Sequence, residues 1–173
     1  EISYVSPPSG ETHLERWPYA SDGIVLERTL RVLVPAGDGP WPLLIAADGN
    51  NLFDPLAPWG GWRLQDAVGE LEEEVLVVGV DNTMERMWEY THTTDKIEGQ
   101  VYGGGGDVYA AFVHDFIRPH LEANYPTTER VGLLGSSLGG LISLHINQLY
   151  PNEYDFVASL SGTLGWGRYG KNQ

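Results

Sequence analysis

The residues best suited to covalent chemistry lie in Gly135-Ser136-Ser137-Leu138-Gly139, which has the pattern Gly-x-Ser-x-Gly. In a nucleophile elbow, a sharp strand-to-helix turn pushes the serine hydroxyl outward, and small flanking residues avoid a clash with the neighbouring strand or helix. With 22 glycines in the chain, about 0.14 such matches arise by chance, so the flanking sequence must support the motif. An apolar run precedes the motif and an apolar helical segment follows it, which favours Ser137 as a nucleophile over a glycine-rich turn without chemistry.

A serine needs fixed hydrogen-bond donors for the oxyanion that forms when it attacks a carbonyl group. In this type of site one donor is the backbone N–H of the residue after the nucleophile, here Leu138. The other comes from the loop after an early strand, for which the turn beginning at Asp48 is the candidate. Gly49 lets that backbone turn inward, so the sequence predicts the amide of Asn50 as the second donor. The alternative is an ordinary Asx-rich turn.

The general base is harder to find in the sequence. The usual order in this type of site is serine, then an acid, then a histidine. The only histidine after Ser137 is His145, which lies on the same predicted helix. At 1.5 Å per residue it is about 12 Å away and cannot turn back to its own elbow. His92, in a predicted loop near the strand ends, remains a candidate, and the usual triad is otherwise incomplete in this chain.

Hydrophobic periodicity predicts the elements that must position Ser137. Alternation over residues 24–34, followed by a Gly/Pro turn, predicts an antiparallel lead-in strand. Continuous apolar runs, typical of strands buried on both faces, occupy residues 43–47, 75–80, 131–134 and 156–160. Helical segments are expected at residues 62–74, 107–124 and 138–149. Asp107 is the predicted N-cap of the middle helix, and Pro119 is expected to kink or shorten it.

Alternating strands and helices predict a single α/β domain, residues 1–173, with a mostly parallel, doubly wound sheet. Ligands bind such sheets at the carboxyl ends of the strands. Four segments are expected to meet at this edge, namely residues 48–53, residues 81–83, the Ser137 elbow and residues 161–163. Their convergence is a second argument for catalysis.

Arg86 and several aromatic residues are candidate substrate-binding residues near the same edge. Arg86 follows the second strand-end segment, where it either binds a substrate carboxylate or forms an internal ion pair with Glu85 or Glu89. Aromatic side chains in predicted loops either wall an acyl or aryl pocket or cap the core. They are Trp59, Trp62, Trp88, Tyr90 and Tyr102, of which Trp59 and Tyr90 are the predicted substrate contacts.

Composition excludes several classes of protein. The formal charge of −14 disfavours nucleic acid as a partner, and the absence of cysteine excludes disulfides and thiolate metal sites. No His, Asp or Glu set has metal-ligand spacing, so no metal and no cofactor is expected. Residues 103–106 are all glycine, but no Gly-Lys-Ser/Thr follows and no strand is predicted directly before them, which argues against nucleotide binding. No apolar stretch is long enough for a membrane span, so a soluble protein is expected, either cytoplasmic or exported.

The chain resembles the "Putative esterase" (esterase D-like) branch of the α/β-hydrolases, which includes siderophore esterases, feruloyl esterases and antigen 85-type acyltransferases. The resemblance covers about residues 25–166 and rests on motifs in the family's order. They are Leu43-Leu-Ile-Ala-Ala-Asp48-Gly-Asn-Asn-Leu-Phe53, Val77-Val-Gly-Val-Asp81-Asn, Arg86 with Glu89-Tyr90-Thr91, residues 103–107, Gly135-Ser-Ser-Leu-Gly-Gly140 and Phe156-Val-Ala-Ser-Leu-Ser-Gly162. It implies an α/β-hydrolase fold, Ser137 as nucleophile, the Leu138 and Asn50 amides as oxyanion donors, and a small-molecule ester substrate.

Members of this family continue past the point that matches residue 173, with further strands that carry the catalytic Asp or Glu and the His. The resemblance therefore implies that the C-terminal strands are missing from this chain and that a complementary C-terminal segment or chain supplies them. Without those strands, residues 156–160 would form an open apolar edge, which favours pairing, including homo-oligomer formation. An esterase is the first expectation, and an acyltransferase of the same fold or a non-catalytic binding or scaffold protein are the alternatives.

Overall fold

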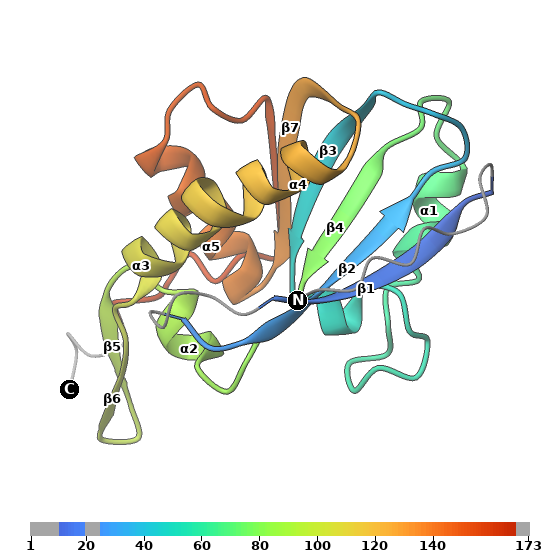
Figure 1. Cartoon of the computed structure of the whole chain (residues 1–173). Helices are drawn as coiled ribbons and strands as arrows, with labels where there is room; N and C mark the ends of the chain where they lie inside the picture. The colour runs from blue at the N-terminus through green and yellow to red at the C-terminus, as the bar shows by residue number, and fades with distance from the viewer. Residues whose placement is uncertain (1–10, 20–24, 169–173) are drawn as a thin grey trace.

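The computed structural model describes residues 11–19 and 25–168 of the chain (Figure 1). Its centre is a six-stranded sheet with the strand order β1-β2-β4-β3-β7-β8. The strands of this sheet are β1 (His13–Tyr19), β2 (Arg28–Val34), β3 (Trp41–Ala47), β4 (Leu76–Val80), β7 (Thr127–Ser136) and β8 (Phe156–Leu160). All four predicted strands are present, and β3, β4 and residues 131–134 of β7 are largely buried as expected. The expected burial of residues 156–160 is wrong, because β8 lies at the edge of the described sheet and none of its residues is buried. The lead-in strand begins at Arg28, later than the expected start at residue 24, which lies outside the described residues.

Strand directions also agree with the prediction of a mixed, mostly parallel sheet. β1 pairs with β2 and β2 pairs with β4 in antiparallel fashion. The β4, β3, β7 and β8 strands then run parallel to one another. Because parallel strands end at the same edge, the segments after β3, β4, β7 and β8 all emerge on one side of the sheet.

The two faces of the sheet are covered by different helices, as a doubly wound architecture requires (Figure 1). Alternate residues of the central strands face a large core that includes Leu43, Ile45 and Val78 and contains the buried faces of the helices between residues 106 and 149. The intervening residues, such as Ala46 and Val77, face a smaller cluster against which the side chains of α1 (Leu64–Gly69) pack. Strands with apolar side chains on both faces therefore read as continuous apolar runs in the sequence.

The helices agree with the prediction in position and differ in their ends. α5 (Leu138–Leu149) has the predicted bounds, whereas α1 is shorter than residues 62–74. Gly69 has a low helix propensity, and the glutamates after it place negative charge at the carboxyl end of the helix, where the helix dipole disfavours it. The middle segment forms α3 (Gly106–Ala111), the π-helical η2 (Phe112–Ile117) and α4 (Arg118–Asn124). Pro119 lies in the first turn of α4 and does not shorten the segment.

The predicted N-cap of this segment is wrong. Gly105 is the N-cap of α3, and Asp107 lies inside the first turn, where its carboxylate hydrogen-bonds to His145. The helix starts earlier because the Gly105 carbonyl oxygen already accepts from the Val108 and Tyr109 amides, at 3.0 Å and 3.1 Å. Gly106 packs closely on the backbone of His92, where a Cβ would lie 2.9 Å from the His92 Cα. A residue with a side chain at this position would push α3 away from the loop.

A small hairpin between β4 and α3 was not predicted. β5 (Thr94–Ile97) and β6 (Gln100–Gly103) pair antiparallel through a tight turn at Glu98 and Gly99, both with positive φ. The expectation that no strand directly precedes the glycines at residues 103–106 is therefore wrong. β6 belongs to this separate two-stranded sheet and not to the central one. Polar and short strands of this kind carry little hydrophobic signal in the sequence.

Candidate active site

Ser137 lies at the sharp turn between β7 and α5. β7 ends at Ser136 and α5 begins at Leu138, so a single residue connects the strand to the helix. Ser137 has φ 56° and ψ −121°, a region that residues with side chains rarely adopt, and the residue is exposed. The backbone strain and the outward side chain are the geometry expected of a nucleophile elbow.

The glycines on both sides of Ser137 are required by close packing. A Cβ on Gly135 would collide with the carbonyl group of Gly139 in the first turn of α5. A Cβ on Gly139 would lie 3.0 Å from Asp48 Oδ2 and 3.1 Å from the Cβ of Ala47 at the end of β3. The first glycine thus lets the strand approach its own helix, and the second lets the helix approach the neighbouring strand.

The start of α5 presents free backbone donors beside Ser137. The first intrahelical bond of this helix is donated by the Leu141 amide to the Ser137 carbonyl oxygen, at 3.1 Å. Helix geometry therefore leaves the amides before Leu141, including that of Leu138, without an intrahelical acceptor. The helix dipole adds partial positive charge at the same end, which favours an anion there.

The turn after β3 has a similar arrangement. Asp48 adopts a left-handed conformation with φ 58° and ψ 45°, and the 3₁₀ turn η1 (Gly49–Asn51) follows. The Asn51 amide donates to the Asp48 carbonyl oxygen at 2.8 Å, so the Asn50 amide precedes the first bond of the turn. A Cβ on Gly49 would lie 2.5 Å from the carbonyl carbon of Gly79 in β4, so only glycine fits.

β3 and β7 are adjacent parallel strands, and this brings the Asn50 turn and the Ser137 elbow to neighbouring positions. Ala46 pairs with Leu134, so both strands end within a few residues of this pair. A Cβ on Gly139 would lie only 3.0 Å from Asp48 Oδ2, so the turn and the helix start are closely packed. The structure thus brings together the three residues predicted to form the reacting centre.

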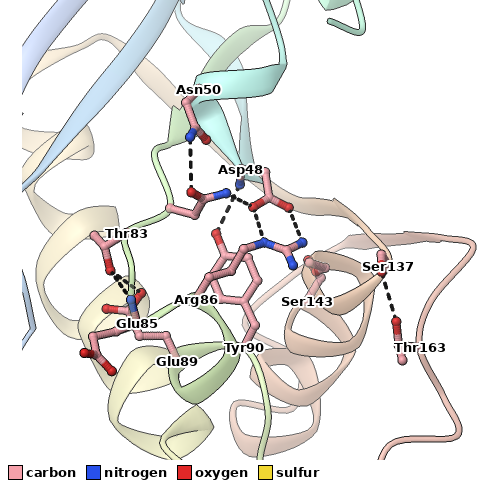
Figure 2. Close-up of polar contacts among 12 residues, drawn as sticks. Asp48, Asn50, Thr83, Glu85, Arg86, Glu89, Tyr90, Ser137, Ser143 and Thr163 are labelled. Carbon is pink, nitrogen blue, oxygen red and sulfur yellow. Dashed lines mark hydrogen bonds and ion pairs between the residues drawn. The ribbon is translucent and has the colours of Figure 1, made fainter. Parts of the chain in front are cut away.

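Thr163, from the loop after β8, is the hydrogen-bond partner of Ser137. Figure 2 shows the hydrogen bond between the two hydroxyls, whose oxygens are 3.1 Å apart, and the Thr163 amide donates to the Ser137 carbonyl oxygen at 3.1 Å. The Ser137 amide in turn donates to Leu160 at the end of β8. The sequence placed residues 161–163 at this edge but gave Thr163 no role, because strand order alone does not show which hydroxyl meets the nucleophile.

The histidines of the chain, all within the described residues, hydrogen-bond or stack elsewhere. His145 Nε2 hydrogen-bonds to Asp107 Oδ1 at 2.7 Å. His13 contacts the Glu15 carboxylate, while the rings of His114 and His120 pack on tyrosines. None of them is a recorded hydrogen-bond partner of Ser137 in the part of the chain that the structure describes.

His92 lies in an exposed loop, and its ring stacks on His145 with a centroid distance of 5.0 Å. Partial burial and the neighbouring His145 lower the pKa of His92. A lowered pKa keeps the imidazole neutral near pH 7, as a base must be. Its stacking partner lies two helical turns along α5 from Ser137, and the side-chain hydrogen bond of the Ser137 hydroxyl is to Thr163 and not to His92.

Arg86 and Tyr90 lie beneath the Asn50 turn. Arg86 belongs to the short helix α2 (Arg86–Glu89), and its guanidinium donates to both carboxylate oxygens of Asp48, at 2.7 Å and 2.8 Å (Figure 2). The internal ion pair is therefore present, but its partner is Asp48 and neither Glu85 nor Glu89. Tyr90 is fully buried, and its hydroxyl oxygen accepts a hydrogen bond from the Asp48 amide at 3.1 Å.

The other aromatic candidates do not form one loop cluster. Trp59 is 86% exposed, in the loop between η1 and α1, whereas Trp62 packs against the smaller core cluster. Trp88 lies in α2 against Gly105, and Tyr102 lies in β6. Only Trp59 combines large exposure with a position after a central strand.

The described residues contain no group of three or more His, Cys, Asp or Glu side chains arranged to hold a metal ion. Within the same residues, no helix has both the length and the apolar character that a membrane crossing needs.

The sequence pattern of the family described as "Putative esterase" matches residues 21–173. The chain belongs to this family. Among curated proteins, the esterase-family chain is 28% identical over 138 residues to "Siderophore triacetylfusarinine C esterase" of Aspergillus fumigatus, covering 75% of this chain and 47% of that protein. It also covers 51% of the uncharacterized protein YbbA of Bacillus subtilis, at 26% identity. The chain thus spans about half the length of these curated relatives.

Solved structures of α/β-hydrolases resemble the esterase-family chain in fold. The BES protein from Bacillus cereus has a TM-score of 0.71 at 22% identity, with 96% of this chain and 68% of that chain covered. An IroE-like serine hydrolase from Shewanella oneidensis also has a TM-score of 0.71 at 22% identity, with 89% and 51% covered. The predicted α/β-hydrolase fold is confirmed, and this chain supplies only part of it relative to these structures.

Proposed function

We propose that this chain carries the nucleophile and the oxyanion donors of a serine esterase that hydrolyses a small-molecule carboxylic ester. One observation carries the proposal: Ser137 is exposed at a strained turn, at the free amino end of α5 and beside the Asn50 turn. Strain of this kind persists only where the surrounding structure enforces it, and it collects at catalytic positions.

The proposed reaction has two halves. The Ser137 Oγ attacks the ester carbonyl carbon while a histidine accepts the hydroxyl proton, and the carbonyl oxygen becomes an oxyanion. The ester C–O bond then breaks, and the alcohol leaves with the proton returned by the histidine. In the second half, water attacks the acyl-enzyme by the same route and releases the acid and free Ser137.

The Leu138 and Asn50 amides are the proposed oxyanion donors. Both are first-turn amides without an intrahelical acceptor, and they come from two elements that pack closely at Gly139 and Asp48. Donors fixed by a helix start and a packed turn need no rearrangement when the charge develops, which is the source of their catalytic effect. Thr163 holds the resting Ser137 hydroxyl and would release it when the base is engaged.

The catalytic histidine and acid are proposed to come from a segment beyond residue 173 or from a partner chain, so that residues 1–173 are an incomplete hydrolase domain. The contacts of the five histidines in this chain support this assignment, as does the share of the curated relatives that the chain spans. At the sheet edge, β8 pairs with β7, and its Phe156 and Leu160 are 56% and 47% exposed. A further parallel strand would cover them.

A siderophore ester is the first substrate to test, because the curated relative from Aspergillus fumigatus is described as a siderophore triacetylfusarinine C esterase. Trp59 is the proposed substrate contact, since its indole is 86% exposed in the loop that follows the Asn50 turn. Arg86 and Tyr90 are held beneath that turn by Asp48, which favours a supporting part over direct substrate binding.

The test is covalent labelling with a fluorophosphonate probe, on the protein as it occurs in the cell. We expect the probe on Ser137, with labelling lost in Ser137→Ala and kept in Ser136→Ala, the matched neighbour. Hydrolysis of a p-nitrophenyl ester and of triacetylfusarinine C should follow the same order, with little change in thermal stability. Turnover that survives Ser137→Ala would contradict the mechanism.

The same experiment separates the two other readings of the site. Labelling of Ser137 with acyl transfer to an added alcohol in place of hydrolysis would indicate an acyltransferase. A folded protein that takes no label would indicate a non-catalytic binding or scaffold protein. The mass of the purified protein should exceed 19.1 kDa, or a second chain should copurify, if the acid and histidine are supplied from outside this sequence.

A further inference from the structure

The Asp48 carboxylate is the centre of a polar network next to the Asn50 side chain (Figure 2). It accepts two hydrogen bonds from Arg86, at 2.7 Å and 2.8 Å, and a third from Asn82 Nδ2 at 2.5 Å. The Asp48 and Arg86 side chains are only 17% and 29% exposed. Three donors on one partly buried carboxylate hold it in a single orientation, because charge-assisted and bidentate bonds are both strong and directional.

The network reaches the Asn50 turn at two points. Asn82 Oδ1 accepts a hydrogen bond from Asn50 Nδ2 at 3.1 Å, so Asp48 is linked to the Asn50 side chain through Asn82. The Asp48 amide donates to the buried Tyr90 hydroxyl at 3.1 Å, which fixes the backbone where it enters the left-handed conformation. A non-glycine residue in this conformation needs such support.

Arg86 is itself held rigidly. Its guanidinium carbon lies 5.1 Å from the centre of the Tyr90 ring. The four-residue helix α2 that carries it is anchored by Glu89, whose carboxylate pairs with Arg28 of β2 at 2.5 Å in the core. The network is therefore tied to the central sheet and not only to a surface loop.

The charge of Asp48 matters because of where the carboxylate lies. Its Oδ2 would be 3.0 Å from a Cβ on Gly139, the residue directly after Leu138. A negative charge at this position opposes the formation of an oxyanion at the Leu138 and Asn50 amides. The cation of Arg86 cancels that charge, and the hydrogen bond to Asp48 raises the pKa of Arg86, so the guanidinium stays charged.

We propose that Asp48 and Arg86 form a neutral clamp that positions the Asn50 amide against the start of α5. Both are positioning residues, and neither contacts the substrate. The inference rests on the proposed function, since the clamp has a catalytic effect only if the two amides bind an oxyanion.

Four variants test the clamp in ester turnover: Arg86→Met, Arg86→Lys, Asp48→Asn and the double variant Asp48→Asn/Arg86→Met. Removing a whole oxyanion donor costs about 10²–10³ in kcat, so a misplaced donor beside an uncompensated carboxylate should lower kcat by about 10–100-fold in Arg86→Met. Asp48→Asn/Arg86→Met removes the leftover charge and should recover kcat several-fold relative to Arg86→Met. Arg86→Lys keeps the charge but not the bidentate geometry, so it should fall between wild type and Arg86→Met.

Two readouts distinguish positioning from other roles. The clamp predicts a change in kcat with KM nearly constant, for neutral and anionic esters alike. If Arg86 binds a substrate carboxylate, Arg86→Met will raise KM for the anionic ester alone, and the clamp is overturned. Arg118→Met is the control, because it removes another partly buried arginine, which pairs with Glu122 and Glu153 and has no recorded contact with the Asn50 turn, and it should leave kcat unchanged.

The outcomes for the clamp and for the esterase are separable. If wild type is labelled at Ser137 and turns over ester while Arg86→Met keeps the kcat of wild type, the clamp is wrong and the esterase stands. An equally lowered kcat in Arg86→Met and Asp48→Asn/Arg86→Met would refute the effect of the uncompensated charge. If wild type takes no label, the proposed function fails first. If Arg86→Met does not fold, Arg86→Lys and Asp48→Asn/Arg86→Met are compared with wild type instead. The clamp then requires the double variant to retain measurable ester turnover.

Discussion

Breaking the buried ion pair between Arg28 and Glu89 should destabilise the fold strongly. The guanidinium donates to both carboxylate oxygens, at 3.1 Å and 2.5 Å, and the two side chains are 0% and 1% exposed. The rings of Tyr109 and Phe112 lie 5.6 Å and 5.0 Å from the guanidinium carbon. Arg28→Met would leave the Glu89 carboxylate in this apolar setting, with the Thr83 hydroxyl at 3.5 Å as its remaining side-chain donor.

The expected size follows from the burial. Removing one partner of a buried pair costs about 3–5 kcal/mol, out of a total that is about 5–15 kcal/mol for a domain. In a domain of this length each kcal/mol shifts Tm by about 2–4 °C, so Arg28→Met should melt about 6–20 °C lower. The double variant Arg28→Met/Glu89→Leu removes both charges and should be within about 1–2 kcal/mol of wild type, because apolar side chains can replace a buried pair.

Thermal and urea unfolding followed by circular dichroism measure these differences. Arg130→Met is the control, since its pair with Glu73 is 60% and 55% exposed and should contribute at most about 1 kcal/mol. A loss below about 1 kcal/mol in Arg28→Met would refute the reasoning. So would a double variant whose loss equals the sum of the two single losses, because coupled partners are not additive.

Two further stability predictions concern the elbow and the pH dependence. Gly135→Ala places a Cβ against the Gly139 carbonyl, so it should lower the free energy of unfolding by about 1–3 kcal/mol and abolish probe labelling. Gly69→Ala is the control, because open space surrounds its Cβ, and it should be neutral or stabilising. Equal effects of the two substitutions on stability would contradict the packing argument. Burial lowers the pKa of His120 in the folded protein, so the unfolded chain binds more protons at mildly acidic pH. The contribution of the neutral His120 ring to the free energy of unfolding is therefore complete above about pH 6.5 and falls as the pH drops toward the folded-state pKa. His120→Phe should therefore flatten the pH dependence of Tm between pH 7.5 and pH 5, and an unchanged slope would assign that dependence to other groups.

Much of the fold could be predicted because burial on both sides of a strand leaves an unbroken apolar run. The bounds of β8 and of α5 agree with the sequence prediction, as their apolar segments end at polar or turn residues. The β5–β6 hairpin was missed because its strands are four residues long and largely exposed, so hydrophobic periodicity is absent. The N-cap of α3 was misplaced because local sequence does not show that the Gly105 carbonyl oxygen accepts from the Val108 and Tyr109 amides.

Part of the candidate site could be predicted from local sequence, and part depends on contacts between distant segments. The glycines around Ser137 and the glycine after Asp48 mark tight turns at strand ends, so local sequence indicated the sharp turn at Ser137 and the turn proposed to hold the second oxyanion donor. The partner of Arg86 could not be predicted, because Asp48 is distant in sequence and two glutamates are nearer. Thr163 reaches Ser137 only because β7 and β8 are neighbours in the sheet.

By itself, the sequence of this protein determined the four parallel strands of the central sheet, the buried helix α5 and the sharp turn that exposes Ser137, because each depends on hydrophobic patterning or on glycine within a few residues. Only the tertiary structure decided which charges and hydroxyls meet: Asp48 with Arg86, Glu89 with Arg28, and Ser137 with Thr163. These pairs join segments from different strands and helices. Their geometry is set by strand order and packing, which no local stretch of sequence contains.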